Sequence, residues 1–177
     1  MQEKKVQKVK SRGDVVADLI IKHRYTRVAE VGVLKGDTAR RVHERCEAEG
    51  CPVERYYAVD RKFGWPFFEW AQVHPTPELI ILPMLSTEAA NHILEPLDLV
   101  YIDADHTEKS VREDVKFWAP KVRSGGIVCG HDYDFSKFPG VTIAVDEYFG
   151  RENIETIPVR GGAHGSRGCD VFVYRVK

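Results

Sequence analysis

Short β-type runs alternate with amphipathic helical patterns along this chain, and that alternation constrains its fold more than any other feature. Runs rich in β-branched and aromatic residues predict strands at residues 27–33, 55–60, 78–82, 98–103, 126–130, 152–159 and 170–175. Helical periodicity predicts helices at residues 13–24, 37–50, 87–94, 108–118 and 141–149, and a loop with a short helix at residues 63–74. Such an order favours right-handed crossovers and a mainly parallel sheet with helices on both faces.

The C-terminal part departs from this alternation. The last two expected strands have no helix between them, so we expect a hairpin that adds an antiparallel strand to a seven-stranded α/β sheet. The glycine-rich connection, residues 160–168, is typical of a flexible hairpin loop, and a lid over a site is the alternative. Residues 1–177 are expected to form one domain, with residues 1–12 as a frayed basic terminus.

Composition argues against several classes of protein. A formal net charge of −1 argues against a nucleic-acid partner held by bulk charge. No apolar run is long enough to cross a membrane, and the start of the chain has no signal-peptide pattern. The four cysteines lack the spacing of zinc sites, so reduced thiols in a cytoplasmic protein are expected.

Polar residues stand at the ends of two neighbouring expected strands. The first strand closes in YIDADH, which supplies Asp103 and His106, and the second closes in GIVCGHD, which supplies His131 and Asp132. Ligands of open α/β sheets bind outside the carboxyl ends of parallel strands, so these side chains are expected around one crevice. Carboxylates suit Mg²⁺, and His131 is a further ligand, a second base or a pocket wall. His106 is the candidate general base, because an imidazole accepts a proton near neutrality.

A second group of polar and glycine residues follows the first two strands. Gly32 and Gly36 allow a tight turn and a close approach of ligand to backbone. The segment matches neither the dinucleotide fingerprint nor a phosphate loop, so a pyrophosphate ligand is disfavoured. Glu30 suits a cationic or amine-bearing group, and Asp60 suits the hydroxyls of a ribose. Together these residues predict a nucleoside that carries an amino acid.

These motifs resemble a known family. The ExGxxxGxxA pattern at residues 30–39 and YAVD at residues 57–60 resemble the first two motifs of class I S-adenosylmethionine-dependent methyltransferases. YIDADH, GGIVCGHDY at residues 125–133 and GVTIAVDEYF at residues 140–149 resemble the small-molecule group that includes the macrocin and mycinamicin O-methyltransferases. The likeness covers most of residues 27–149 and implies a Rossmann-like methyltransferase fold.

The resemblance also implies roles for individual residues. The residues implied at the cofactor are Glu30, Gly32 and Gly36 at the methionine, Asp60 at the ribose, Ser86 at the adenine, and Asp103 between cofactor and acceptor. Asp103 and His106 are the implied catalytic residues, and Asp103, Asp132 and His131 the implied metal ligands. The chain has Glu108 where the family often has an aromatic residue, and His131-Asp132 where catechol-type enzymes have Asp-Asn. The second departure leaves the metal, Mg²⁺ or none, open.

We therefore expect transfer of a methyl group from S-adenosylmethionine to an oxygen of a small hydroxylated molecule, such as a sugar or polyketide glycoside. The alternatives are a metal-dependent hydroxylase or hydrolase on the same scaffold and a non-catalytic nucleoside-binding module. A homodimer is a further option, because the chain offers few segments for substrate contacts. Asp114 is expected to make surface contacts on its helix, and the aromatic segment 63–68 either covers the site or packs in the core.

Overall fold

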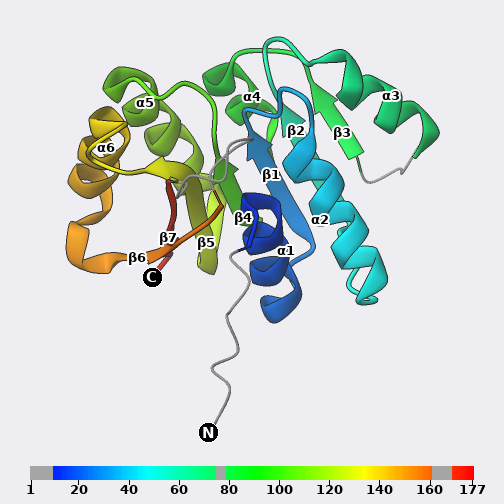
Figure 1. Cartoon of the computed structure of the whole chain (residues 1–177), viewed down its shortest axis with the longest axis horizontal. Coiled ribbons are helices and arrows are strands. Elements are labelled where there is room, and N and C mark those ends of the chain that lie inside the picture. Colours follow the sequence, from blue (N-terminus) through cyan, green and yellow to red (C-terminus); the bar gives the residue numbers. More distant parts are fainter. Residues whose placement is uncertain (1–9, 75–78, 161–168) are drawn as a thin grey trace, which may run out of the picture.

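The computed structural model describes residues 10–74, 79–160 and 169–177, and it contains one seven-stranded sheet (Figure 1). The strand order is β3-β2-β1-β4-β5-β7-β6. The strands are β1 (Arg27–Val31), β2 (Arg55–Val59), β3 (Leu79–Leu82), β4 (Leu97–Ile102), β5 (Val122–Tyr133), β6 (Ile154–Ile157) and β7 (Asp170–Arg175). Parallel pairing joins the first five strands, whereas β7 pairs antiparallel with both β5 and β6. The expected mainly parallel sheet with a C-terminal antiparallel hairpin is therefore confirmed.

Six α-helices of the described chain cover the two faces of the sheet. They are α1 (Arg12–His23), α2 (Asp37–Ala48), α3 (Trp65–Val73), α4 (Ser86–His92), α5 (Glu108–Trp118) and α6 (Pro139–Phe149). Buried side chains of α1, α2 and α3 share one core cluster, and those of α4, α5 and α6 share the other. None of the helices described has both the length and the apolar character of a membrane span.

Strand β4 shows why the sheet is covered on both faces. All six of its residues are buried, and its apolar residues divide between the two clusters: Val100 and Ile102 pack on one face, Leu99 and Tyr101 on the other. A continuous apolar run is typical of a parallel strand buried on both sides. The chain order reverses at β1, which lies between β2 and β4, so a crevice is expected at the carboxyl ends of β1 and β4.

Strand β5 is longer than the sequence predicts. The expected strand ended at Gly130, and its parallel pairing with β4 does end there. Pairing with β7 continues to Tyr133, however, with a register shift after Gly130. His131 and Asp132 therefore lie in a bulge inside β5 rather than after it, and Asp132 has a left-handed backbone with φ 57°.

Two further expectations on local structure change. The chain enters α1 at Arg12, and Ser11 forms a capping box with Asp14, so the end of the basic segment belongs to the fold. The segment expected as a loop with a short helix forms α3 over nine residues, and Phe63 and Phe67 stack in the core. The core-packing alternative is therefore correct for both rings. The lid alternative concerns residues 161–168, which lie outside the described residues.

Candidate active site

A cavity of about 630 Å³ opens at the carboxyl ends of β1, β2 and β4. Most of the site residues expected from the sequence line it, and these are Glu30, Gly32, Asp60, Ser86, Asp103, His106 and Asp132. Gly36 and His131 are outside the described lining. The structure thus brings both predicted groups, at the β1–β2 end and at the β4–β5 end, to a single cavity.

The glycine turn after β1 approaches the end of β4 closely. Gly32 has φ 93°, and a Cβ atom there would lie 2.2 Å from the carbonyl oxygen of Asp103. Only glycine fits this close approach of two backbones. Gly36 has φ 77°, and a Cβ atom there would lie 2.5 Å from Phe67 Cδ2, so this position shapes the contact between α2 and α3.

Glu30 is a buried acid in the floor of the cavity. Its side chain is 2% exposed, and the Tyr56 hydroxyl donates a hydrogen bond to Oε2. Burial raises the pKa of Glu30 to about 8, against the opposing effect of the Tyr56 hydrogen bond. The carboxyl group is therefore largely protonated at pH 7, and a cation placed beside it would favour its ionised form.

Asp60, directly after β2, is fixed by two backbone amides. Leu34 N donates to Oδ2 at 2.8 Å, and Lys62 N donates to Oδ1 at 2.8 Å. Because each carboxylate oxygen accepts more than one hydrogen bond, both oxygens can still accept a bond from the cavity side. The arrangement suits a pair of neighbouring hydroxyl groups.

Ser86 belongs to a buried polar relay between α4 and α5. Trp118 Nε1 donates to Ser86 Oγ at 2.8 Å, and the Ser86 hydroxyl donates to Asp114 Oδ1. The expectation that Asp114 makes surface contacts is wrong, because the residue is 4% exposed and lines the cavity. Its helix places it on the inner face, beside the buried Val115 and Trp118.

Asp103 divides its two oxygens between different partners. Oδ2 accepts a hydrogen bond from the Tyr101 hydroxyl at 3.0 Å and lies 3.3 Å from Arg12 Nη1. Oδ1 faces His106 Nε2 at 3.8 Å and His131 Nδ1 at 3.9 Å. Arg12 was not predicted as a site residue, because residues 1–12 were assigned to a frayed terminus. The only local signal for it is a cation in the first turn of a helix, where the dipole disfavours positive charge.

His106 and His131 approach Asp132 from different directions. His106 Nε2 lies 2.7 Å from Asp132 Oδ2, and His131 Nδ1 lies 3.1 Å from Asp132 Oδ1. The second contact lacks hydrogen-bond geometry, so among the described residues the buried Nδ1 of His131 has no hydrogen-bond partner. A buried nitrogen without a partner is costly unless a ligand contacts it.

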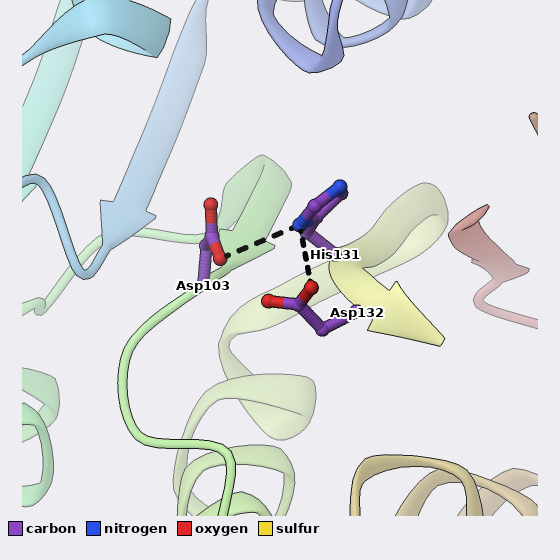
Figure 2. Close-up of side chains that lie close together, drawn as sticks. All are labelled: Asp103, His131 and Asp132. Carbon is purple, nitrogen blue, oxygen red and sulfur yellow. Dashed lines mark ion pairs between the residues drawn. The ribbon is translucent and has the colours of Figure 1, made fainter. Parts of the chain in front are cut away.

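Asp103, His131 and Asp132 converge, as Figure 2 shows. Each offers one ligand atom, and these atoms lie within 4.8 Å of one another. The unpartnered Nδ1 and the two carboxylates fit a divalent cation. Because one donor is an imidazole nitrogen, the set suits an ion such as Mn²⁺, Fe²⁺ or Zn²⁺ better than Mg²⁺, which prefers oxygen ligands.

The two carboxylates also control the charge of His106. Asp103 and Asp132 raise the pKa of His106 to about 10, against the opposing effect of partial burial. Burial works to raise the pKa of Asp132, but His106 and His131 hold it well below its usual range. His106 is therefore an imidazolium at neutral pH in this arrangement, and it can accept a proton only after the influence of one carboxylate is reduced.

Comparisons with known proteins agree with this geometry. The family model of a methyltransferase domain matches residues 29–133, more than half of the chain. No curated protein sequence matches the chain.

Solved structures show a similar fold at low identity. An O-methyltransferase of tomaymycin synthesis from Streptomyces achromogenes, solved with S-adenosylmethionine, has a TM-score of 0.69 at 13% identity, over 94% of this chain and 80% of the other. An O-methyltransferase from Bacillus cereus, solved with S-adenosylhomocysteine, has a TM-score of 0.64 at 17% identity, again over 94% and 80%. A putative rRNA methylase from Clostridium thermocellum has a TM-score of 0.70 at 9% identity, over 97% and 99%.

Proposed function

The chain belongs to the family with this methyltransferase domain, and we propose that it transfers a methyl group from S-adenosylmethionine to an oxygen of a small hydroxylated molecule. One observation carries the proposal: the glycine turn of Gly32, the fixed carboxylate of Asp60 and the Asp103–His106–Asp132 group line one cavity. The cavity thus has a nucleoside half and an acid/base half on neighbouring strand ends.

In this proposal the cofactor lies along the ends of β1 and β2. Glu30 and the turn from Gly32 to Gly36 surround its amino-acid end, and the protonated carboxyl of Glu30 ionises beside the positive charge of the donor. Asp60 accepts hydrogen bonds from the ribose hydroxyls with the oxygens that Leu34 and Lys62 hold in place. Ser86, at the start of α4, lies at the adenine.

The acceptor half is formed by Asp103, His106 and Asp132. Methyl transfer is an in-line displacement, so much of the rate enhancement comes from holding the acceptor oxygen against the methyl carbon. When the acceptor weakens the contact of His106 with Asp132, the pKa of His106 falls and the imidazolium can release its own proton to water. The neutral ring is then positioned to take the hydroxyl proton. The triad of Asp103, His131 and Asp132 would hold a divalent cation, which when bound supplies Lewis-acid polarisation of the hydroxyl.

The charges of the cavity favour a small neutral or cationic acceptor over a polyanion. Even with Glu30 protonated, its carboxylates outnumber its cationic side chains: Asp37, Asp60, Asp103, Asp105, Glu113, Asp114 and Asp132 against Arg12, Lys35, Arg61 and His106. A nucleic-acid backbone would meet repulsion at this opening. This supports the O-methyltransferase neighbours over the rRNA methylases as guides to the acceptor.

Calorimetry tests the cofactor assignment. We expect S-adenosylhomocysteine to bind the wild-type chain, and Asp60→Ala to weaken that binding about tenfold to a hundredfold, because two hydrogen bonds to a charged group are lost. Titration with Mn²⁺ and with Mg²⁺ tests the metal triad, with tighter binding of Mn²⁺ expected. Absence of S-adenosylhomocysteine binding would contradict the proposal, and unchanged affinity in Asp60→Ala would contradict the ribose assignment.

A further inference from the structure

Asp114 is a buried carboxylate in the cavity wall that the roles described so far leave unused. Its Oδ1 accepts the Ser86 hydroxyl, and Ser86 in turn accepts Trp118 Nε1 at 2.8 Å. This relay fixes the carboxylate between α4 and α5. Within the described chain, no hydrogen bond reaches the other oxygen, Oδ2, although the residue lines the cavity.

The surroundings of Asp114 provide no positive charge. No cation among the described residues forms an ion pair with it, and the charges that act on it, Glu113 and Asp105, are both negative. Burial raises its pKa to about 6, against the opposing effect of the Ser86 hydrogen bond. Oδ2 faces the cavity, where water can reach it, so a ligand that displaces this water must offer a hydrogen-bond donor in its place.

The position of Asp114 relative to Asp60 shows which part of a nucleoside it would meet. Asp60 follows β2, and its backbone nitrogen donates to Leu82 O at the end of the adjacent strand β3. The chain then passes Met84 and Leu85, which line the cavity, and reaches Ser86 beside Asp114. Asp60 would hold the ribose, and the attached base would point toward β3. Met84 and Leu85 would then contact the faces or the edge of the base, and Asp114 would lie at its hydrogen-bonding edge.

We propose that Asp114 reads the nucleobase of the methyl donor by accepting a hydrogen bond from the exocyclic amino group of adenine. The inference rests on the proposed function, since it requires an adenosyl donor. A carboxylate accepts hydrogen bonds and repels a carbonyl oxygen, so it favours a 6-amino purine over a 6-oxo purine. Asp114 is therefore a specificity-determining residue for the base, while Ser86 and Trp118 position it.

A pair of ligands that differ only at the base edge around position 6 tests this inference. S-adenosylhomocysteine carries a 6-amino group beside an unprotonated N1, and S-inosylhomocysteine carries a 6-oxo group beside a protonated N1. Calorimetry with the wild-type chain should give about 10- to 100-fold tighter binding of the adenosyl ligand. In Asp114→Asn, whose amide can donate to a 6-oxo group, the ratio should fall to within about threefold. Glu155→Gln, on the exposed side of β6, should keep the wild-type ratio.

The outcomes separate the two proposals. Equal binding of both ligands by the wild-type chain would overturn the role of Asp114, and this result does not depend on any variant folding. A preference that Asp114→Asn retains in full would overturn it as well. If the wild-type chain bound neither ligand, the proposed function itself would be wrong, and the inference with it.

Discussion

At the scale of the single residue, Gly32 and Gly50 provide a matched pair for testing the close approach at the β1 turn. Both have positive φ, but a Cβ atom on Gly32 would meet the Asp103 backbone at 2.2 Å, whereas one on Gly50 would meet nothing within 4 Å. Gly50→Ala should cost about 1 kcal/mol of unfolding free energy, the price of left-handed backbone alone. Gly32→Ala should cost about 3 kcal/mol or more, because backbone must move as well. Urea denaturation measures both, and equal losses would contradict the contact.

Residues with a fixed relation to a strand end could be predicted from the sequence, and residues that reach the site from elsewhere could not. Glu30, Asp60 and Asp103 lie at the ends of β1, β2 and β4, so the parallel sheet brings them together. Arg12 and Asp114 enter from helices α1 and α5. Their arrival depends on how those helices pack on the sheet, which periodicity alone does not specify.

At the scale of the element, the bulge in β5 determines the charge of His106. Asp132→Asn keeps a residue that tolerates the left-handed backbone and removes the negative charge 2.7 Å from His106 Nε2. The pKa of His106, held near 10 by Asp103 and Asp132, should fall by at least about one unit. An NMR titration of the His106 ring, with chelator present, measures it. An unchanged pKa would show that Asp132 does not hold the proton in place.

The sequence predicted the end of a strand well where the strand's own residues determine it. It predicted the end poorly where a strand distant in sequence extends the pairing. Strand β4 ends at Ile102, where its apolar run ends, one residue before the predicted end at Asp103. Strand β5 continues past its parallel neighbour because β7, which is distant in sequence, pairs with its last residues. Helix α3 begins at Trp65 with Pro66 in its first turn, a position that suits proline, and it fills nine residues of the segment for which the sequence predicted a loop with a short helix.

At the scale of the whole molecule, the buried Glu30 makes stability depend on pH. Its pKa is 4.5 as a free group and about 8 in the fold, so between these values the folded state keeps a proton that the unfolded state has lost. The free energy of unfolding should therefore fall as pH rises from 5 to 8, by up to about 5 kcal/mol, and then level off. Glu30→Gln, which cannot ionise, should lose this slope in urea denaturation series at several pH values.

His106 adds a second contribution of the same sign. Its raised pKa gives stability that is complete below pH 6.5 and is lost as pH rises toward about 10. The Glu30→Gln variant should therefore keep the part of the slope above pH 6.5 and the smaller contribution of Asp114, whose raised pKa of about 6 acts below that pH. A variant that behaves like the wild type between pH 5 and 6.5 would show that Glu30 ionises normally in the fold.

The fold as a whole followed from the sequence because every level of the pattern agrees. Alternating strands and helices require crossovers, crossovers favour parallel strands, and the uncovered hairpin at the end can only add an antiparallel strand. The sequence did not specify that β7 would lie inside β6 in the sheet. The only local signal for that order is composition, because β7 carries the apolar run VFVY whereas β6 has the exposed Glu155 and Thr156 in its middle.

The place of β7 has a consequence for how the protein is made. This strand follows every other strand of the sheet in the sequence, yet it lies between β5 and β6 and completes the pairing of the segment that holds His131 and Asp132. The nucleoside half, from β1 to β3, can form while synthesis continues. A nascent chain that stops before Asp170 would lack the strand that supports the bulge. The proposed acceptor half can therefore take its final form only after β7 has been synthesised.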